Sequence, residues 1–179
     1  MSNVLIISTS LRGGSNSELL AQECRRGAEE AGHKVTFLSL KGKKIQYCIG
    51  CLACQKTEKC VLRDDAAEFV EQVKNADILV FATPIYYYEM CGQMKTLLDR
   101  LNPLYPSDYK FRKVYMIATA AEASDEAFEK AYQGLQGWVD CFERAELCGL
   151  VCGGGIEGPN DAKNHEDAMQ KAYELGKEL

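Results

Sequence analysis

The sequence predicts an α/β protein whose single domain, residues 1–179, is built on a doubly wound parallel sheet of five strands with helices on both faces. Short apolar runs rich in β-branched and aromatic residues alternate with segments of helical period from one end of the chain to the other. No repeat, low-complexity tract or proline- and serine-rich linker interrupts this alternation. A length of 179 residues, 46% of them hydrophobic, suits one domain with a sizeable core.

The expected strands are short apolar runs bounded by polar or turn-forming residues. They cover residues 4–7, 35–38, 78–81, 114–117 and 147–152. In the doubly wound order 2-1-3-4-5, the first and third strands lie on either side of a switch point. Ligands of such sheets bind at the carboxyl ends of the strands beside that point.

Helices are expected in the connections between these strands. The first should cover residues 17–31, because this segment opens with polar residues and ends before Gly32, a common residue at helix C-termini. Asp64 and Asp65 are suited to cap the second helix. Apolar stripes at helical spacing mark faces that should pack in the core. The stripes lie within residues 69–73, 94–101 and 128–142, and a last helix should follow residue 161.

Charge and composition exclude several classes of function. The net charge of -5 leaves no basic face for a nucleic-acid backbone, and the lysines of residues 41–44 fit a solvated loop. No apolar run approaches the roughly 20 residues that a membrane-spanning helix needs, and the N-terminus shows no secretory signal. Nine cysteines without such a signal indicate reduced thiols or ligands rather than a disulfide framework. We therefore expect a cytoplasmic protein with no nucleic-acid or membrane partner.

Four closely spaced cysteines form the most specific motif in the chain. They are Cys48, Cys51, Cys54 and Cys60, with the spacing C-x2-C-x2-C-x5-C. Thiolates so close in sequence can converge on one centre, and an iron–sulfur cluster, free thiols and zinc are the three interpretations. Zinc sites more often use two separated C-x2-C pairs. The other cysteines lie inside helix or strand patterns and should be small core residues. They are Cys24, Cys91, Cys141, Cys148 and Cys152.

The connection after the first strand, residues 8–17, joins a buried strand to the start of a helix and is rich in hydroxyl side chains. Unpaired N–H groups in the first helical turn and the helix dipole both favour an anion there. The candidate ligands of a phosphate monoester are Ser10, Arg12, Ser15, Asn16 and Ser17. A polar N-capping loop explains these residue types equally well, since serine and asparagine are the usual caps. The position beside the switch point favours the anion site.

The connection after the third strand, residues 83–90, should face the first connection across the switch point. It contains Pro84, which fixes the turn, and three consecutive tyrosines, residues 86–88, which cannot all pack inward from a loop. At least one tyrosine ring should therefore cover a flat ligand, although one or two of them are equally suited to close the core. A phosphate on one connection and a planar ring against the other describe flavin mononucleotide, FMN.

These connections resemble those of the flavodoxin-like NAD(P)H-dependent FMN reductase family, and the resemblance covers nearly the whole chain. The motifs that carry it are Ser10-Leu11-Arg12, Ser15-Asn16-Ser17, Thr83-Pro84-Ile85-Tyr86 and residues 92–100. The resemblance implies a flavodoxin-like fold, an FMN cofactor, NAD(P)H as co-substrate and a homodimer or a dimer of dimers. It also implies that the first connection binds the FMN phosphate. The isoalloxazine ring would run along Pro84, Ile85, Tyr86 and Tyr87.

Two details of the family motifs need interpretation. Leu11 replaces a proline often found in the family, but it removes no hydrogen-bond donor. Asp99 and Arg100 end the last motif, and we interpret them as a helix-end charge pair or a dimer contact.

Hydride transfer to a flavin belongs to the cofactor and requires no acid–base residue, so no catalytic side chain is assigned. Backbone N–H groups of Thr119, Ala120 and Ala121, after the fourth strand, are expected to stabilise negative charge on the reduced flavin. The glycine-rich run at residues 153–158 satisfies G-x-G-x-x-G, but too few residues follow it for a dinucleotide-binding unit. We expect this run to form a mobile connection near the open edge of the flavin site.

The cysteine run resembles the compact cluster motif of the iron–sulfur flavoproteins within this superfamily. That resemblance implies a [4Fe-4S] cluster held by four thiolates, although many relatives with the pattern look like simple flavin reductases. Because the run follows the second strand, a cluster should lie at the same sheet edge as FMN or near the flavin of a partner subunit. The expected function is an FMN-dependent NAD(P)H oxidoreductase of the flavin or quinone reductase type, with the cluster as a route for single electrons. The alternative is a flavodoxin-like electron carrier or redox sensor without turnover of its own.

Overall fold

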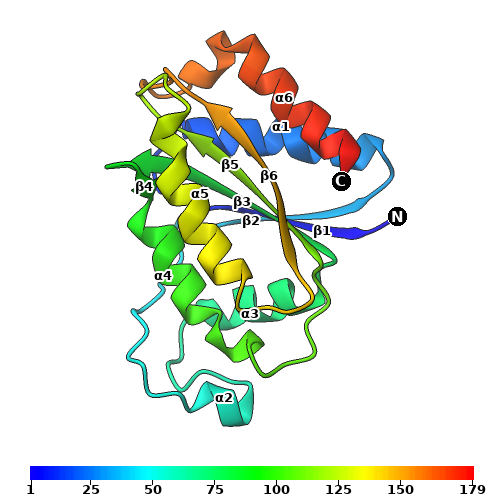
Figure 1. Ribbon diagram of the computed structural model, residues 1–179, viewed down its shortest axis with the longest axis vertical. Helices are drawn as coiled ribbons and strands as arrows, with labels where there is room; N and C mark the ends of the chain where they lie inside the picture. Colours follow the sequence, from blue (N-terminus) through cyan, green and yellow to red (C-terminus); the bar gives the residue numbers. More distant parts are fainter.

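The sheet of the computed structural model, which describes residues 1–179, has parallel strands in the order β2-β1-β3-β5-β6 (Figure 1). These strands are β1 (Asn3–Ser8), β2 (Lys34–Ser39), β3 (Ile78–Tyr86), β5 (Lys113–Thr119) and β6 (Glu146–Gly153). A short strand, β4 (Glu89–Met90), pairs antiparallel with the end of β3. The fold class and strand order predicted from the sequence are confirmed, whereas β4 is not predicted.

Helices cover both faces of the sheet (Figure 1). One face carries α1 (Asn16–Glu30) and α6 (Glu166–Glu178), and the other carries α3 (Ala66–Asn75), α4 (Gly92–Arg100) and α5 (Glu126–Val139). The connections contain the short helix α2 (Cys54–Thr57) and the 3-10 segments η1 (Asn102–Leu104) and η2 (Asp161–Asn164). None of these helices combines the length and the apolar character needed to cross a bilayer.

Alternate residues of the central strands point to opposite faces, so each strand supplies both halves of the core. In β1, Leu5 and Ile7 pack with the layer of α3, α4 and α5, whereas Val4 and Ile6 pack with α1 and α6. All of these side chains are buried. The core therefore fixes β1 from both sides, and with it the start of the connection that follows.

The start of one helix and the end of another differ from the prediction. Helix α1 begins at Asn16, one residue earlier than predicted, and Ser15 caps it. Helix α5 ends at Val139, so Phe142, the last member of the predicted stripe, lies in the turn that follows. Phe142 nevertheless stays buried, with its ring centroid 4.7 Å from that of Trp138. The stripe therefore predicts burial correctly but not the end of the helix.

The prediction that five cysteines are small core residues is only partly correct. Cys24 and Cys91 are buried, but Cys141 and Cys148 are exposed and Cys152 is half-buried. Cys148 and Cys152 lie on β6, which is an edge strand of the sheet, and Cys141 lies in the turn after α5. Edge strands and turns expose residues that a sequence pattern alone assigns to the core.

Candidate functional site

The carboxyl ends of β1, β3 and β5 meet at one edge of the sheet, where residues of their connections line a cavity of about 190 Å³. We call it the sheet-edge cavity. Its lining consists of Ser10, Arg12, Ser15, Asn16, Pro84, Ile85, Tyr86, Thr119, Ala120, Ala121, Ile156 and Glu157. Of the residues predicted to bind FMN, only Ser17 and Tyr87 are absent from this lining: Ser17 is fully buried in α1, and Tyr87 is 99% exposed.

The connection between β1 and α1 carries a group of unpaired backbone donors. The N–H groups of residues 10, 11, 13, 14 and 15 donate to no acceptor within the chain. Ser10 and Ser15 are only 4% and 5% exposed, and buried N–H groups in folded proteins almost always have a partner. The first turn of α1 adds donors without intrahelical acceptors, together with the positive end of its dipole. This arrangement indicates an anion site.

Ser15 has a second role as the cap of α1. Its hydroxyl accepts a hydrogen bond from the N–H of Glu18 at 3.3 Å and lies 3.2 Å from the hydroxyl of Ser17. The N-capping interpretation is therefore correct for Ser15. It does not compete with the anion site, because capping occupies the side chain while the backbone N–H of the same residue stays free.

Two of the predicted phosphate ligands hold the segment after β6 against the cavity. Arg12 donates from Nη1 to the carbonyl of Glu157 at 3.0 Å and from Nη2 to that of Gly158 at 3.1 Å. Asn16 donates to the carbonyl of Gly158 at 2.8 Å and accepts from the N–H of Ala162 at 3.1 Å. The glycine-rich run thus lies near the predicted flavin site, as expected, but side chains of the first connection fasten it in place.

The predicted connection at residues 83–90 is largely a β-hairpin, because β3 continues as far as Tyr86 before turning back into β4. Tyr87 and Tyr88 form the turn with φ values of 52° and 66°. Tyr86, Tyr87 and Tyr88 are 52%, 99% and 50% exposed, so the alternative that some of them close the core is wrong. Tyr86 alone contributes to the sheet-edge cavity, while the Tyr88 ring lies 5.6 Å from the Nζ of Lys130.

The connection after β5 offers fewer free donors than the sequence suggests. The N–H of Ala120 is occupied, because it donates to the carbonyl of Gly153 at 3.0 Å. The carbonyl of Ala120 in turn accepts from Ile156 at 2.9 Å, which joins this connection to the segment after β6. The N–H of Ala121 donates to no acceptor in the chain. Ala121 is therefore the predicted donor that remains available in this connection.

The four cysteines of the C-x2-C-x2-C-x5-C motif line another cavity, of about 470 Å³, which we call the cysteine cavity. The connection from β2 to α3 carries them past the C-terminal end of α4, at the bottom of Figure 1. Leu98, Asn102 and Trp138 contribute to the opposite walls. Cys141 also lines this cavity, which places it among the motif cysteines rather than in the core.

The motif cysteines surround the cavity without forming a finished metal site. No group of three or more histidine, cysteine, aspartate or glutamate side chains is arranged to hold a metal ion. Cys48 and Cys51 are exposed, Cys60 is half-buried and Cys54 is buried, and all four are free thiols. Sulfur donors around one cavity are nevertheless the ligand set that iron–sulfur clusters use.

A buried ion pair fastens the cysteine connection to α4. The Arg100 side chain is 1% exposed, and its Nη1 and Nη2 atoms donate to the two carboxylate oxygens of Asp64 at 2.7 and 3.0 Å. Nη1 also donates to the carbonyl of Gln46 at 2.7 Å, and Nη2 donates to Cys60 Sγ at 3.4 Å. Burial acts to raise the pKa of Asp64, but hydrogen bonds from Arg100 and from the N–H groups of Gln46 and Ala66 hold it below its ordinary value.

The interpretation of Asp99 and Arg100 as a helix-end charge pair is wrong, and the alternative, a dimer contact, stays a prediction for Asp99 alone, because Arg100 is buried. Asp99 pairs at the surface with Lys95, at 2.6 Å, while Arg100 turns inward to Asp64. No sequence motif indicates the partner 36 residues away. The one available signal is that Arg100 lies three residues after Leu97, at the edge of the apolar stripe of α4.

Two further features suit an anionic group in the cysteine cavity. Asn102, at the start of η1, donates from Nδ2 to Cys54 Sγ at 3.0 Å. Nε of Arg100 is buried and has no acceptor in the chain, and such orphaned donors are rare in folded proteins. The N–H groups that Arg100 and Asn102 direct at Cys60 and Cys54 fit sulfur ligands that carry negative charge.

The segment that carries the four motif cysteines, residues 48–60, contains three residues in the left-handed backbone conformation. Gly50, Leu52 and Glu58 have φ values of 65°, 55° and 54°. This left-handed conformation costs a residue other than glycine on the order of 1 kcal/mol. Strained backbone of this kind clusters at functional sites, where the surrounding structure fixes it.

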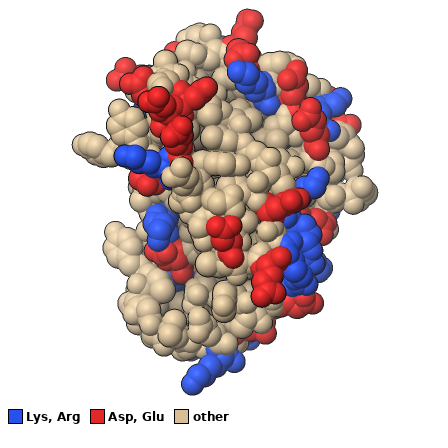
Figure 2. Space-filling view, in the orientation of Figure 1, with Lys and Arg blue, Asp and Glu red and all other residues tan.

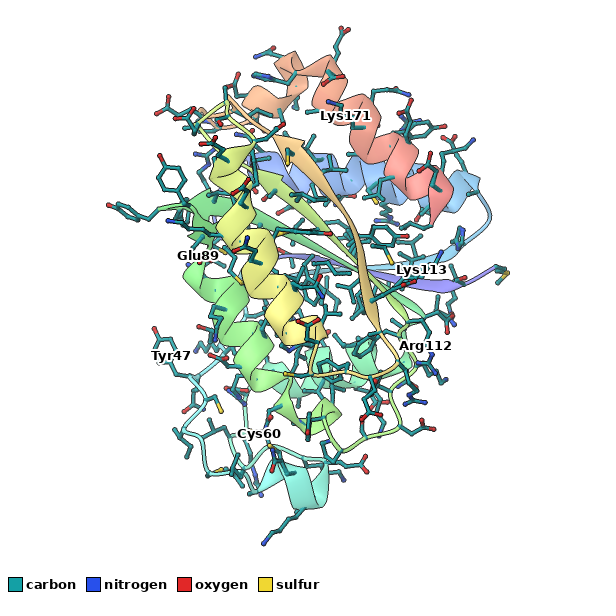
Figure 3. All side chains as sticks on the ribbon, viewed as in Figure 1. Tyr47, Cys60, Glu89, Arg112, Lys113 and Lys171 are labelled. Carbon is teal, nitrogen blue, oxygen red and sulfur yellow. The ribbon has the colours of Figure 1, made fainter.

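Helix α4 separates the cysteine cavity from the sheet edge. Its 9 residues span about 13 Å. A third cavity, of about 490 Å³, lies between the two sites: Tyr86 lines it and the sheet-edge cavity, and Tyr47, which precedes Cys48, also lines it. Figure 3 shows Tyr47 between Glu89 of β4 and Cys60. The expectation that the cysteines share the sheet edge with FMN is therefore wrong within one chain.

Comparisons with known proteins agree with this fold and with the class of protein that the sequence predicts. Residues 2–143 match the family model of the NADPH-dependent FMN reductases. The chain is 29% identical to an iron-sulfur flavoprotein of Methanocaldococcus jannaschii, over 98% of this chain and 94% of that protein. It is 27% identical to an iron-sulfur flavoprotein of Methanosarcina thermophila, over 97% and 91% of the two chains. An NAD(P)H:quinone oxidoreductase from Methanothermobacter marburgensis shares the fold, with a TM-score of 0.76 and 18% identity over 99% and 96% of the two chains.

The chain belongs to the NADPH-dependent FMN reductase family, which confirms the resemblance carried by the connections after β1 and β3. It is an FMN-dependent NAD(P)H oxidoreductase. The similarity to iron-sulfur flavoproteins over nearly its whole length supports that branch of the superfamily.

Proposed function

We propose that the sheet-edge cavity holds FMN, with the phosphate at residues 10–17 and the isoalloxazine ring along Pro84, Ile85 and Tyr86. The observation that carries this proposal is the group of unpaired N–H donors between β1 and α1. Free backbone donors at a helix N-terminus bind phosphate well. Arg12 adds a positive charge beside them.

When bound, FMN supplies the redox chemistry, taking a hydride from NAD(P)H and passing electrons to an acceptor. The protein binds and orients it. Pro84 and Ile85 form an apolar wall for the flat ring and exclude water from it. The free N–H of Ala121 can donate to the edge of the ring where negative charge accumulates on reduction. We propose activity of the flavin or quinone reductase type, since hydride transfer to the flavin needs no acid–base side chain, and solvent supplies the proton that a quinone takes up on reduction.

A homodimer, or a dimer of dimers, is part of this proposal. At about 190 Å³ the sheet-edge cavity is smaller than the roughly 300–1,000 Å³ of most ligand pockets, so part of the flavin would lie outside it. Leu11, Tyr47 and Tyr87 are 49%, 80% and 99% exposed. The lower left of the face in Figure 2 likewise has few charged side chains. A partner subunit could cover this surface and the flavin.

We also propose that the protein is cytoplasmic, because its nine free thiols suit a reducing compartment.

The substitution Arg12→Ala tests the proposed phosphate site. It should weaken FMN binding by about 1–3 kcal/mol, because it removes a charge-assisted hydrogen bond and releases Glu157 and Gly158 from the cavity wall. This corresponds to a roughly 5- to 150-fold rise in Kd, measured by titrating apoprotein into FMN and following flavin fluorescence. Arg25→Ala is the matched control, since Arg25 forms only an exposed ion pair on α1. Equal Kd values for Arg12→Ala and the unaltered protein would contradict the assignment.

We propose further that the four motif cysteines hold a [4Fe-4S] cluster that passes single electrons between FMN and a one-electron partner. The sulfurs surround one cavity, and Arg100 and Asn102 already donate hydrogen bonds to two of them. The relatives from Methanocaldococcus jannaschii and Methanosarcina thermophila carry the name iron-sulfur flavoprotein. Because α4 lies between the two sites of one chain, the flavin of a partner subunit is the alternative electron donor.

Iron content tests the cluster. Anaerobically prepared protein should contain about four iron atoms per FMN, and Cys54→Ser with Cys60→Ser should lower this ratio to near zero while FMN stays bound. Cys148→Ser is the matched control, because Cys148 is an exposed thiol outside the cysteine cavity. Zinc without iron, or neither metal in the unaltered protein, would overturn the cluster in favour of a zinc site or free thiols.

A further inference from the structure

Arg100 and Asn102 lie outside the four-cysteine motif, yet each donates a hydrogen bond to one of its sulfurs. The distances are 3.4 Å from Arg100 Nη2 to Cys60 Sγ and 3.0 Å from Asn102 Nδ2 to Cys54 Sγ. Both donors stand on ordered elements, the last residue of α4 and the first residue of η1. The cysteines they contact are the two less exposed members of the motif.

The guanidinium of Arg100 also closes the base of the cysteine connection. It contacts the carbonyl of Gln46 on one side and the carboxylate of Asp64 on the other, at 2.7 Å in each case. Asp64 accepts a further bond from the N–H of Gln46 at 2.8 Å. Next to this pair along the chain, Lys44 and Asp65 form two hydrogen bonds. The N–H of Lys44 donates to the Asp65 carboxylate at 2.6 Å, and the N–H of Asp65 donates to the Lys44 carbonyl at 3.1 Å. These contacts hold both ends of the connection together without any metal.

The charge of Arg100 is placed where it can act on a cluster. The side chains of Arg100 and Asp64 are 1% and 5% exposed, so solvent screens them little. Nε of Arg100 is left without an acceptor. Hydrogen bonds to cluster sulfurs and nearby charge are among the factors that set the reduction potential of such clusters. Hydrogen-bond donors stabilise the more negative, reduced form and therefore raise that potential, and in the Arg100–Asp64 pair it is the positive partner that contacts the sulfur.

We propose that Arg100 and Asn102 are positioning residues for the cluster: they fix Cys60 and Cys54 before iron is bound, and they raise the reduction potential of the cluster once it is bound. This inference rests on the cluster proposed above. Half of the ligand set is thus ordered by the protein, and the exposed Cys48 and Cys51 complete it when iron arrives.

The variant Asn102→Leu removes one donor at nearly constant volume. Arg100→Gln combined with Asp64→Asn replaces the buried ion pair by a neutral pair, and so removes the positive donor beside Cys60 together with its carboxylate partner. The midpoint potential of the cluster, measured by anaerobic redox titration with electron paramagnetic resonance, should shift downward in both variants. Arg100→Lys, tested with Asp64 intact, should shift the midpoint potential downward by less, because lysine keeps the positive charge. Arg63→Gln is the matched control, since Arg63 is exposed on the same connection and contacts no sulfur.

If variants with full iron content have the same midpoint potential as the unaltered protein, the proposed electrostatic role is wrong. That result would leave the ordering role standing. An iron-free unaltered protein would overturn the proposed cluster itself, and this is seen before any variant is compared. The ordering role has its own readout in iron-free protein. Amide hydrogen exchange across residues 46–64 should be faster in the neutral-pair variant than in Arg63→Gln, and equal exchange would overturn that role.

Discussion

Asp64→Ala is expected to lower the free energy of unfolding of the iron-free protein by about 3–5 kcal/mol, because it leaves a buried guanidinium without its carboxylate. Arg100 would keep only the Gln46 carbonyl and Cys60 as partners. Urea denaturation followed by circular dichroism measures the loss. Asp108→Ala is the matched control, since Asp108 pairs with Arg144 at 2.9 Å but is 92% exposed. Exposed pairs of this kind contribute about 0–1 kcal/mol, and equal losses in the two variants would contradict the account of the buried pair.

The same ion pair gives stability a defined pH dependence. The pKa of Asp64 is lower in the folded chain than its ordinary value, so the folded state prefers the ionised carboxylate. This stabilisation is complete above the unfolded pKa of about 4 and is lost as the pH falls through the lower folded value. Asp64→Asn should therefore flatten this part of the acid limb of the stability profile, and an unchanged profile would contradict the shift.

Gly176→Ala is the second substitution with a large expected effect. Helices α1 and α6 cross so closely that a Cβ on Gly176 would overlap the backbone carbonyl of Cys24 and lie 2.8 Å from the nitrogen of Ala28. Backbone atoms cannot move aside as a side chain can, so the helices must separate. We expect a loss of about 3 kcal/mol of unfolding free energy, at the upper end of overpacking effects, measured by urea denaturation.

Gly137→Ala supplies the matched control for this close approach. Gly137 lies inside α5, and a Cβ there would meet no atom within 4 Å. Alanine in a helix interior is favoured over glycine by about 0.5–1 kcal/mol. The two substitutions should therefore change stability in opposite directions. Destabilisation of similar size in both would show that helix packing is not the cause.

The sheet and the sheet-edge cavity are predictable from the sequence because each depends on a regular pattern. The alternation of apolar and helical segments indicates a doubly wound sheet, for which 2-1-3-4-5 is a common strand order. The buried strand β1 is a continuous apolar run in the sequence, as expected for a strand covered on both faces. Once the order is fixed, the connections after β1, β3 and β5 must meet at one edge. Ser10, Pro84 and Ala121 are far apart in the chain, yet they line one cavity for this reason.

The features that the sequence does not predict depend on single long-range contacts. Tyr87 and Tyr88 adopt positive φ in the β3–β4 hairpin, where glycine and asparagine are the usual signals. Arg100 is buried, although arginine is almost always exposed unless paired. Its partner Asp64 lies in a connection without hydrophobic period, so no pattern places the cysteines at the end of α4. A lone side-chain pair leaves no periodic trace in the sequence.

Anaerobic mixing of the FMN-loaded protein with NADPH and, separately, with NADH measures the proposed reductase activity most directly. We predict that at least one of the two nucleotides bleaches the visible absorbance of the flavin, because FMN bound as proposed in the sheet-edge cavity would be able to accept a hydride. Sodium dithionite is the control that shows the bound flavin to be reducible. A flavin that dithionite bleaches but that stays oxidised with both nucleotides would contradict the reductase and favour an electron carrier.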